Sequence, residues 1–137
     1  MRYIPTEWLQ GIPCSVVAMA CADYARTKEW RPQYDEYFSK ELDGTGYPSH
    51  SGRHAAGKAC GYLSLDGFNR LVRAHFPVQK KVYYNRANRV LLKDYLAMLD
   101  QAALICVKGH FIYADKKDYW SFFDNANDPV VCVWFLK

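Results

Sequence analysis

The sequence contains no apolar run approaching the roughly 18 to 20 residues that a helix needs to cross a bilayer, so we expect no membrane-spanning segment. Its opening residues, MRYIPTEWLQG, include one arginine but no continuous apolar core, and we therefore expect no signal peptide. Internal repeats and low-complexity tracts are also missing. These absences predict a soluble, unexported protein with no membrane partner.

A disulfide framework is missing as well. The cysteines are odd in number and scattered along the chain, and three of them stand inside strongly apolar segments. This pattern favours free thiols in a reducing compartment, which we take to be the cytoplasm, or the host cytoplasm for a viral protein. The five cysteines are Cys14, Cys21, Cys60, Cys106 and Cys132.

Basic residues are not concentrated in one long cluster. The net charge of +4 comes from 18 basic and 14 acidic residues spread along the chain. The densest basic stretches are 79–89 and 70–75, and the first has Tyr83 and Tyr84 between its charges, as in a stacking strip for single-stranded nucleic acid. A solvated loop between two helices explains the same residues, so we expect no nucleic-acid partner.

The length and composition predict one compact domain over residues 1–137, since half of the 137 residues are apolar. The run that follows Pro13 is apolar nearly all round, which predicts a central buried helix. Residues 31–42 predict a second helix, with Pro32 at its first position. Residues 43–61 are dense in glycine, serine and proline without periodicity, and predict a long loop.

The second half of the chain changes character. Apolar spacing predicts helices over 64–77 and 89–100. Segments rich in β-branched and aromatic residues then alternate with turn residues, which predicts an antiparallel sheet of consecutive strands. Helices followed by such a meander indicate an α+β fold. The predicted strands are 102–109, 110–115, 119–124 and 130–137.

Two residues have the chemistry of a thiol hydrolase. Such an enzyme needs a thiolate, an imidazole that pairs with it and protonates the leaving group, and a polar group that orients the imidazole. Cys14 begins the apolar helix, where the unsatisfied amides favour the thiolate. His110 begins a predicted strand, so its ring can project from the sheet toward the end of the helix.

The orienting group is expected one hairpin downstream of His110. If 110–115 and 119–124 pair around the turn DKKD, Asp124 at the end of the second strand falls near His110, with Asn125 as the second candidate. Gln10 precedes Cys14 by four residues, and its amide can complete an oxyanion hole with the Cys14 backbone N–H.

Together, Gln10 and Cys14 at an apolar helix, Gly109 and His110 at a strand, and Asp124 after an aromatic strand resemble the papain-like cysteine peptidase superfamily. The likeness is greatest to its minimal single-domain members, such as bacteriocin-processing peptidase domains and small phage or bacterial proteins. It implies N-terminal helices, with a central Cys-bearing helix packed on a C-terminal antiparallel sheet. It also implies cleavage of a peptide or isopeptide bond in a protein or peptide substrate by a Cys–His–Asp triad.

Two other functions fit the same residues. One is acyl transfer to an amine, as in transglutaminase-like relatives, and the other is a catalytically inactive binding or inhibitory module that uses the 43–61 loop. His50 and His54, with Cys60 nearby, have the residue types of a zinc site, but they stand in a glycine- and serine-rich stretch that lacks a helix to align them. We therefore expect neither a metal nor a cofactor.

Overall fold

The chain divides into two compact units. One comprises Met1–Ile4 with Pro77–Lys137, and the other comprises Pro5–Phe76. None of the helices in the described part of the chain has the length and apolar content needed to cross a bilayer. The computed structural model describes residues 2–3, 14–29, 65–107, 110–116, 118–121 and 124–137.

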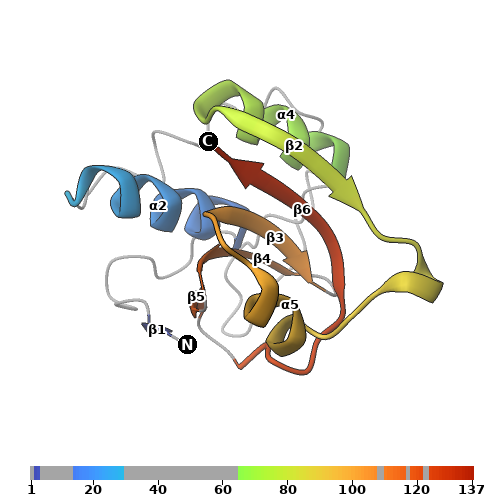
Figure 1. The fold of residues 1–137 in the computed structure, drawn as a ribbon. Helices are drawn as coiled ribbons and strands as arrows, with labels where there is room; N and C mark the ends of the chain where they lie inside the picture. The colour runs from blue at the N-terminus through green and yellow to red at the C-terminus, as the bar shows by residue number, and fades with distance from the viewer. Residues whose placement is uncertain (1, 4–13, 30–64, 108–109, 117, 122–123) are drawn as a thin grey trace, which may run out of the picture. The chain divides into compact units, whose positions relative to one another are not determined.

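The elements follow the predicted order only in part: most strands come after the helices, but strands at 2–3 and 78–83 precede the last helix (Figure 1). The unit Pro5–Phe76 contains helices α2 (Cys14–Thr27) and α4 (Leu65–His75). The other unit contains β1 (Arg2–Tyr3), β2 (Val78–Tyr83), the 3-10 turn η2 (Arg86–Asn88), α5 (Leu92–Met98), β3 (Ala103–Val107), β4 (His110–Asp115), β5 (Asp118–Ser121) and β6 (Val130–Leu136).

Helix α2 is buried over residues 17–22, as its composition predicts. Met19 and Cys21 in this stretch are fully buried. The helix ends where Lys28 turns into the left-handed region, at φ 62°, and donates its N–H to Tyr24 O over 2.7 Å. The predicted buried helix is therefore confirmed, and it begins at Cys14 as expected.

Helix α4 buries one face and exposes the other. Phe68, Leu71 and Val72 are fully buried at helical spacing, while Arg70 and Arg73 are exposed. Pro77 follows the helix, as predicted, because proline cannot continue the hydrogen-bond ladder. Within the same unit, the Arg26 guanidinium at the end of α2 lies 5.9 Å from the centroid of the Phe76 ring.

The six strands form one sheet in the order β1-β5-β4-β3-β6-β2. From β5 to β2, each strand runs antiparallel to the next in this order. Strand β1 pairs with β5 in parallel. Two hairpins set the register: Val107 lies opposite His110, and Asp115 lies opposite Asp118. The α+β class and the predicted hairpin around DKKD are confirmed.

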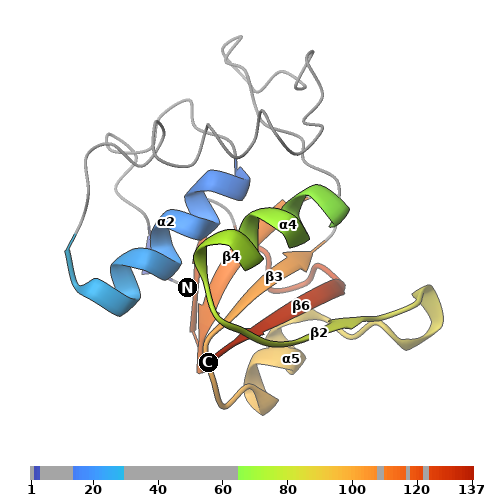
Figure 2. The ribbon, with the colours of Figure 1, turned by 90° about the horizontal axis from the view of Figure 1, so that it is seen from above.

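Helix α5 covers one face of this sheet (Figure 2). Alternate residues of the strands point to that face because the side-chain period of a strand is two. Each fully buried aliphatic side chain contributes about 1.5–3 kcal/mol, so this cluster is a main source of the unit's stability. Its buried members are Leu92, Tyr95, Leu96, Leu99, Ala103, Ile105, Val107, Ile112, Ala114, Tyr119, Val130 and Val133.

The largest departure from the sequence prediction concerns residues 79–89. We expected a loop between two helices, but residues 78–83 form strand β2, antiparallel to β6. A register shift between Val78 and Lys80 breaks the alternation that would have marked a strand. Exposed lysines such as Lys80 and Lys81 are typical of sheet edges, where they discourage further pairing.

Several boundaries also differ. Helix α5 covers only 92–98 of the predicted 89–100, because Leu91 is already in extended conformation and bridges to Pro129. Strand β5 ends at Ser121 rather than at Asp124. The predicted helix at 31–42 and the predicted loop at 43–61 lie outside the described residues. The packing of α2 on the sheet and the single domain stay predictions.

Candidate functional site

Cys14 is the first residue of α2, the position that the sequence predicts for the nucleophile. The structure describes this residue by its backbone. A helix of 14 residues presents the unsatisfied N–H groups of its first turn, together with the positive end of its dipole, at this position. Gln10, the predicted oxyanion donor, lies outside the described residues.

The cysteines predicted to be core thiols are confirmed where they are described. Cys21, Cys106 and Cys132 are reduced and buried. Burial raises the pKa of Cys106 to about 12 and that of Cys132 to about 11, and it raises the pKa of Cys21 still further. A thiol whose pKa is raised in this way is protonated and inert near neutral pH.

His110 begins β4 and is half-buried. It shares a strand face with Ile112 and Ala114, and both of these belong to the cluster under α5. His110 is therefore directed to the α5 side of the sheet, at the end of the β3–β4 hairpin. This location confirms the prediction that His110 lies at the junction of two consecutive strands.

A chain of hydrogen bonds leads away from the His110 ring. Nε2 of His110 lies 3.4 Å from Oγ of Ser121, a long contact from the end of β5. Ser121 Oγ donates to Oδ1 of Asn125 over 2.6 Å, and Nδ2 of Asn125 donates to Oδ2 of Asp128 over 2.8 Å. Ser121 is 1% exposed and Asn125 is 6% exposed, so most of this chain is shielded from water.

The direction of these bonds selects a tautomer for His110. The Asp128 carboxylate only accepts hydrogen bonds, so the Asn125 amide must turn its nitrogen to Asp128 and its oxygen to Ser121. The single hydroxyl proton of Ser121 is then used on Asn125. The remaining lone pairs of Ser121 can only accept, which places the proton of neutral His110 on Nε2 and makes Nδ1 the basic nitrogen.

Asp124, the first candidate for the orienting group, has a different set of contacts. Its carboxylate accepts a hydrogen bond from Ala126 N over 3.0 Å and another from the Tyr119 hydroxyl over 3.1 Å. These two bonds, the backbone one first, hold the pKa of Asp124 below its ordinary value. The Tyr119 oxygen also accepts from Asn125 N over 3.1 Å, so Asp124 and Tyr119 together fix the backbone that carries Asn125.

The structure therefore brings His110 together with Asn125, the second candidate, through Ser121. Sequence reasoning missed Ser121 and Tyr119. The register of the β4–β5 hairpin could have located Ser121. Because Asp115 lies opposite Asp118, the same antiparallel register places Ile112 opposite Ser121. Ile112 in turn shares a face with His110. Ser121 is thus a diagonal neighbour of His110, within reach of a side-chain contact.

No group of three or more acidic, cysteine or histidine side chains able to hold a metal ion occurs among the described residues. His50, His54 and Cys60, the residues weighed for a zinc site, lie outside them.

Comparisons with known proteins give no match. No protein-family model matches the chain, and no curated protein or solved structure matches it significantly.

Proposed function

We propose that this protein is a papain-like thiol hydrolase that cleaves a peptide or isopeptide bond, with Cys14 as nucleophile and His110 as acid and base. The observation that carries the proposal is the shielded hydrogen-bond chain from Asp128 through Asn125 and Ser121 to His110. A chain of this kind restricts the ring and sets its tautomer. A histidine that acts as acid and base in a thiol hydrolase needs both.

Cys14 supports the same reading from the other unit. The first turn of a helix is where a thiolate is stabilised by free N–H groups and by the dipole. Three of the other cysteines are buried with raised pKa values, so they are poor nucleophiles. Among the four cysteines at least partly described, Cys14 alone stands at the start of a helix.

The proposed reaction runs in two halves. The Cys14 thiolate attacks the carbonyl carbon, and the oxyanion is held by the Cys14 backbone N–H and the Gln10 side chain. The proton on His110 Nδ1 passes to the leaving amine as the C–N bond breaks, which leaves a thioester on Cys14. Water then attacks the thioester and gives its proton to Nδ1, and the carboxylic acid leaves with the Cys14 thiolate regenerated. Ser121 and Asn125 act through His110, as positioning residues.

Asp124 keeps a supporting role in this scheme. It anchors Tyr119 and the 124–126 turn, and both of these hold the Asn125 backbone in place. The orienting amide thus lies one residue after the carboxylate that the sequence favours.

Alkylation with iodoacetamide tests the proposal directly. Near neutral pH, Cys14 should be modified well before the four other cysteines, and the modified position is found by peptide mass spectrometry. The pH at which half of the Cys14 reactivity is reached should lie below the value of about 8.5 that is typical of a free thiol. His110→Ala should slow the reaction at Cys14 and move this midpoint upward.

The control is Asp115→Ala, which changes a half-buried polar residue at the far end of β4 and should leave the rate at Cys14 unchanged. Equal rates at Cys14 and at the other accessible thiols would contradict the proposal. A reactive Cys14 that shows no turnover of a peptide library would favour the inactive binding module. Amide products in the presence of a primary amine would identify acyl transfer.

A further inference from the structure

Residues 78–93 form a basic ribbon whose backbone is held in place. The segment contains five basic residues and no acidic one: Lys80, Lys81, Arg86, Arg89 and Lys93. The expectation of no nucleic-acid partner rested on a solvated loop at this position. The structure instead has strand β2, at one end of the strand order, followed by η2. The edge strand displays its two lysines on both faces of the sheet: Lys80 lies over Phe135 on the face that α5 covers, and Lys81 lies over Trp134 on the opposite face.

An exposed tyrosine stands within this ribbon. Tyr83 is 56% exposed, and the Arg89 guanidinium lies 5.8 Å from the centroid of its ring. Arg89 also donates to the Tyr83 hydroxyl over 3.1 Å and to Tyr84 O over 3.0 Å. Arg89 thereby stiffens the turn after β2 and keeps an aromatic side chain in water among positive charges.

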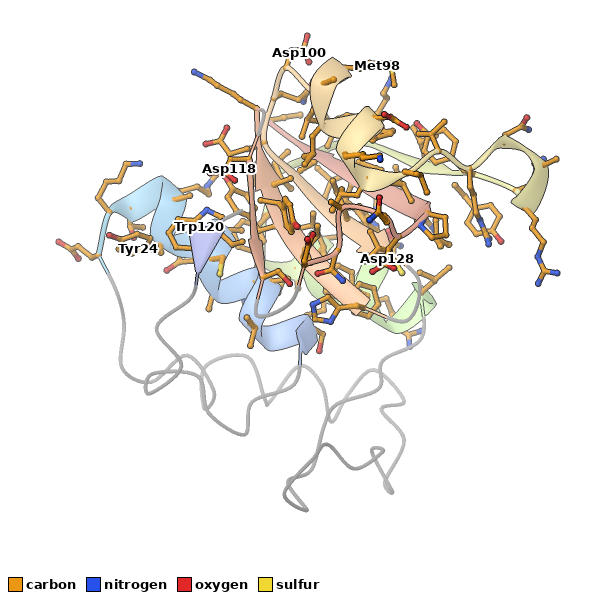
Figure 3. All side chains as sticks on the ribbon, turned by 90° about the horizontal axis from the view of Figure 1, so that it is seen from below. Tyr24, Met98, Asp100, Asp118, Trp120 and Asp128 are labelled. Atoms are coloured by element: carbon orange, nitrogen blue, oxygen red, sulfur yellow. The ribbon has the colours of Figure 1, made fainter. Side chains whose placement is uncertain are left out.

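A cavity of about 170 Å³ opens beside the ribbon. The Tyr84 and Tyr95 rings meet edge to face at 5.8 Å, with their hydroxyl oxygens 3.0 Å apart. Met98, which is 69% exposed, and Asp100 lie near each other at the end of α5 (Figure 3). The lining consists of Tyr84, Tyr95, Met98, Leu99, Asp100 and Phe135.

Charges of both signs border this cavity. The Lys80 ammonium lies 5.3 Å from the centroid of the Phe135 ring, and Asp100 supplies a carboxylate to the lining. A simple anion would be repelled by Asp100, and a simple cation would be repelled by Lys80. A nucleotide satisfies both residues, because its base offers a flat ring with amino donors for Asp100 and its phosphate is attracted to Lys80.

We propose that this edge of the sheet binds single-stranded nucleic acid, with one base in the cavity between Tyr84, Tyr95 and Phe135 and the phosphates crossing the β2 edge, from Lys80 on the cavity face to Lys81 on the other face. A single strand is required because only an unstacked base can enter such a cavity. Aromatic walls and nearby cations are the usual components of sites of this kind. The surface lies within one unit and uses neither Cys14 nor His110, so this proposal stands or falls independently of the hydrolase proposal.

Fluorescence anisotropy with labelled single strands of about 12 nucleotides, as RNA and as DNA, tests the ribbon. Binding should weaken as salt rises from about 50 to 200 mM. The double variant Lys80→Gln/Lys81→Gln should lower the affinity roughly tenfold and reduce the salt slope by about 1.4, since each phosphate contact to a single strand contributes about 0.7. The control is Lys116→Gln, which removes an exposed lysine from the β4–β5 turn. Strands β3 and β6 separate this turn from β2, so the change should leave the salt slope unchanged.

The cavity is tested by Met98→Glu, which adds a negative charge at an exposed position on its rim. Ala97→Glu is the matched control, because Ala97 is exposed on the same helix and does not line the cavity. Met98→Glu should weaken binding by roughly tenfold, the scale of one lost base stack, and clearly more than Ala97→Glu. Thermal unfolding of both variants shows whether the fold is kept.

Four results would overturn the proposal. The first three are no binding of single strands at low salt, equal effects of Met98→Glu and Ala97→Glu, and equal binding of a glutamate-rich peptide. Equal binding of the peptide would identify an acidic protein partner. Saturation by a mononucleotide with no gain from a longer strand would also overturn it, because the ribbon would then contribute nothing.

Discussion

Oγ of Ser121 lies 3.4 Å from Nε2 of His110, and its own proton is directed to Asn125. This relationship makes the hydroxyl an acceptor toward the ring, so the serine selects which nitrogen of His110 is protonated. Ser121 is nearly inaccessible to solvent, which prevents water from taking over that role.

Ser121→Ala should therefore change both stability and the histidine tautomer. Loss of the hydroxyl leaves the buried Asn125 Oδ1 without its donor, at a cost of about 1–3 kcal/mol in the free energy of unfolding. Nitrogen-15 NMR of the wild type should show neutral His110 protonated at Nε2, and the variant should show a mixture of tautomers. Ser121→Thr retains the hydroxyl and should restore the wild-type spectrum. An unchanged spectrum in Ser121→Ala would refute the role of Ser121.

Ser15→Ala should have the opposite effect on stability. Ser15 is fully buried, and within the described part of the chain its Oγ has no hydrogen-bond partner. A buried hydroxyl without a partner costs about 1–3 kcal/mol, so its removal should raise the melting temperature by a few degrees. Differential scanning calorimetry of this variant beside Ser121→Ala compares two changes of identical chemistry. A lower melting temperature for Ser15→Ala would show that its hydroxyl is in fact satisfied.

Asp124→Asn should reduce the dependence of the melting temperature on pH in the acid range. The Ala126 N–H and the Tyr119 hydroxyl lower the pKa of Asp124 in the folded state. Its carboxylate therefore contributes stability above the unfolded pKa of about 3.9, and this contribution is lost as the pH falls through the folded value. Melting temperatures measured from about pH 2.5 to 6 should show a wild-type advantage above about pH 5 that disappears in acid. A constant difference across this range would count against the two hydrogen bonds.

Lys116→Gly should stabilise the β4–β5 hairpin. Lys116 has φ 56° in the turn between Asp115 and Asp118, in a region that glycine enters without steric cost. We expect a gain of about 0.5–1 kcal/mol in denaturant unfolding. The same change at Lys93, in the first turn of α5, should instead lose up to about 1 kcal/mol, because glycine gives up more backbone freedom when it enters a helix. A loss at both positions would mean that the Lys116 side chain contributes contacts of its own.

Strong local patterns in the sequence predicted much of the fold. The apolar run from Cys14 marks helix α2, Pro77 follows helix α4, and the DKKD turn set the β4–β5 register, so the α+β class followed from short-range chemistry. Strand β2 was missed because its pairing with β6 joins residues about fifty positions apart, and no local pattern encodes such a contact.

The candidate site was also predicted only where local sequence patterns mark the residues. His110 was identifiable at the start of a strand, and Cys14 at the start of a helix, because both positions follow from element boundaries. Ser121 was not, because an isolated serine in an aromatic strand has no distinctive pattern of its own. The choice between Asp124 and Asn125 depended on which side chain turns inward, and that is decided by the tight turn of residues 124–128 rather than by residue type.

The position of β6 affects how the sheet can form during synthesis. β6 is the last strand in chain order, yet it lies between β3 and β2 and joins the two parts of the sheet. On the ribosome, β3, β4 and β5 can pair as a meander as soon as they emerge, but β2 has no neighbour until residues 130–136 leave the exit tunnel. Until then β3 presents an open edge of apolar residues, on which a second chain could pair, and the arrival of β6 closes this edge.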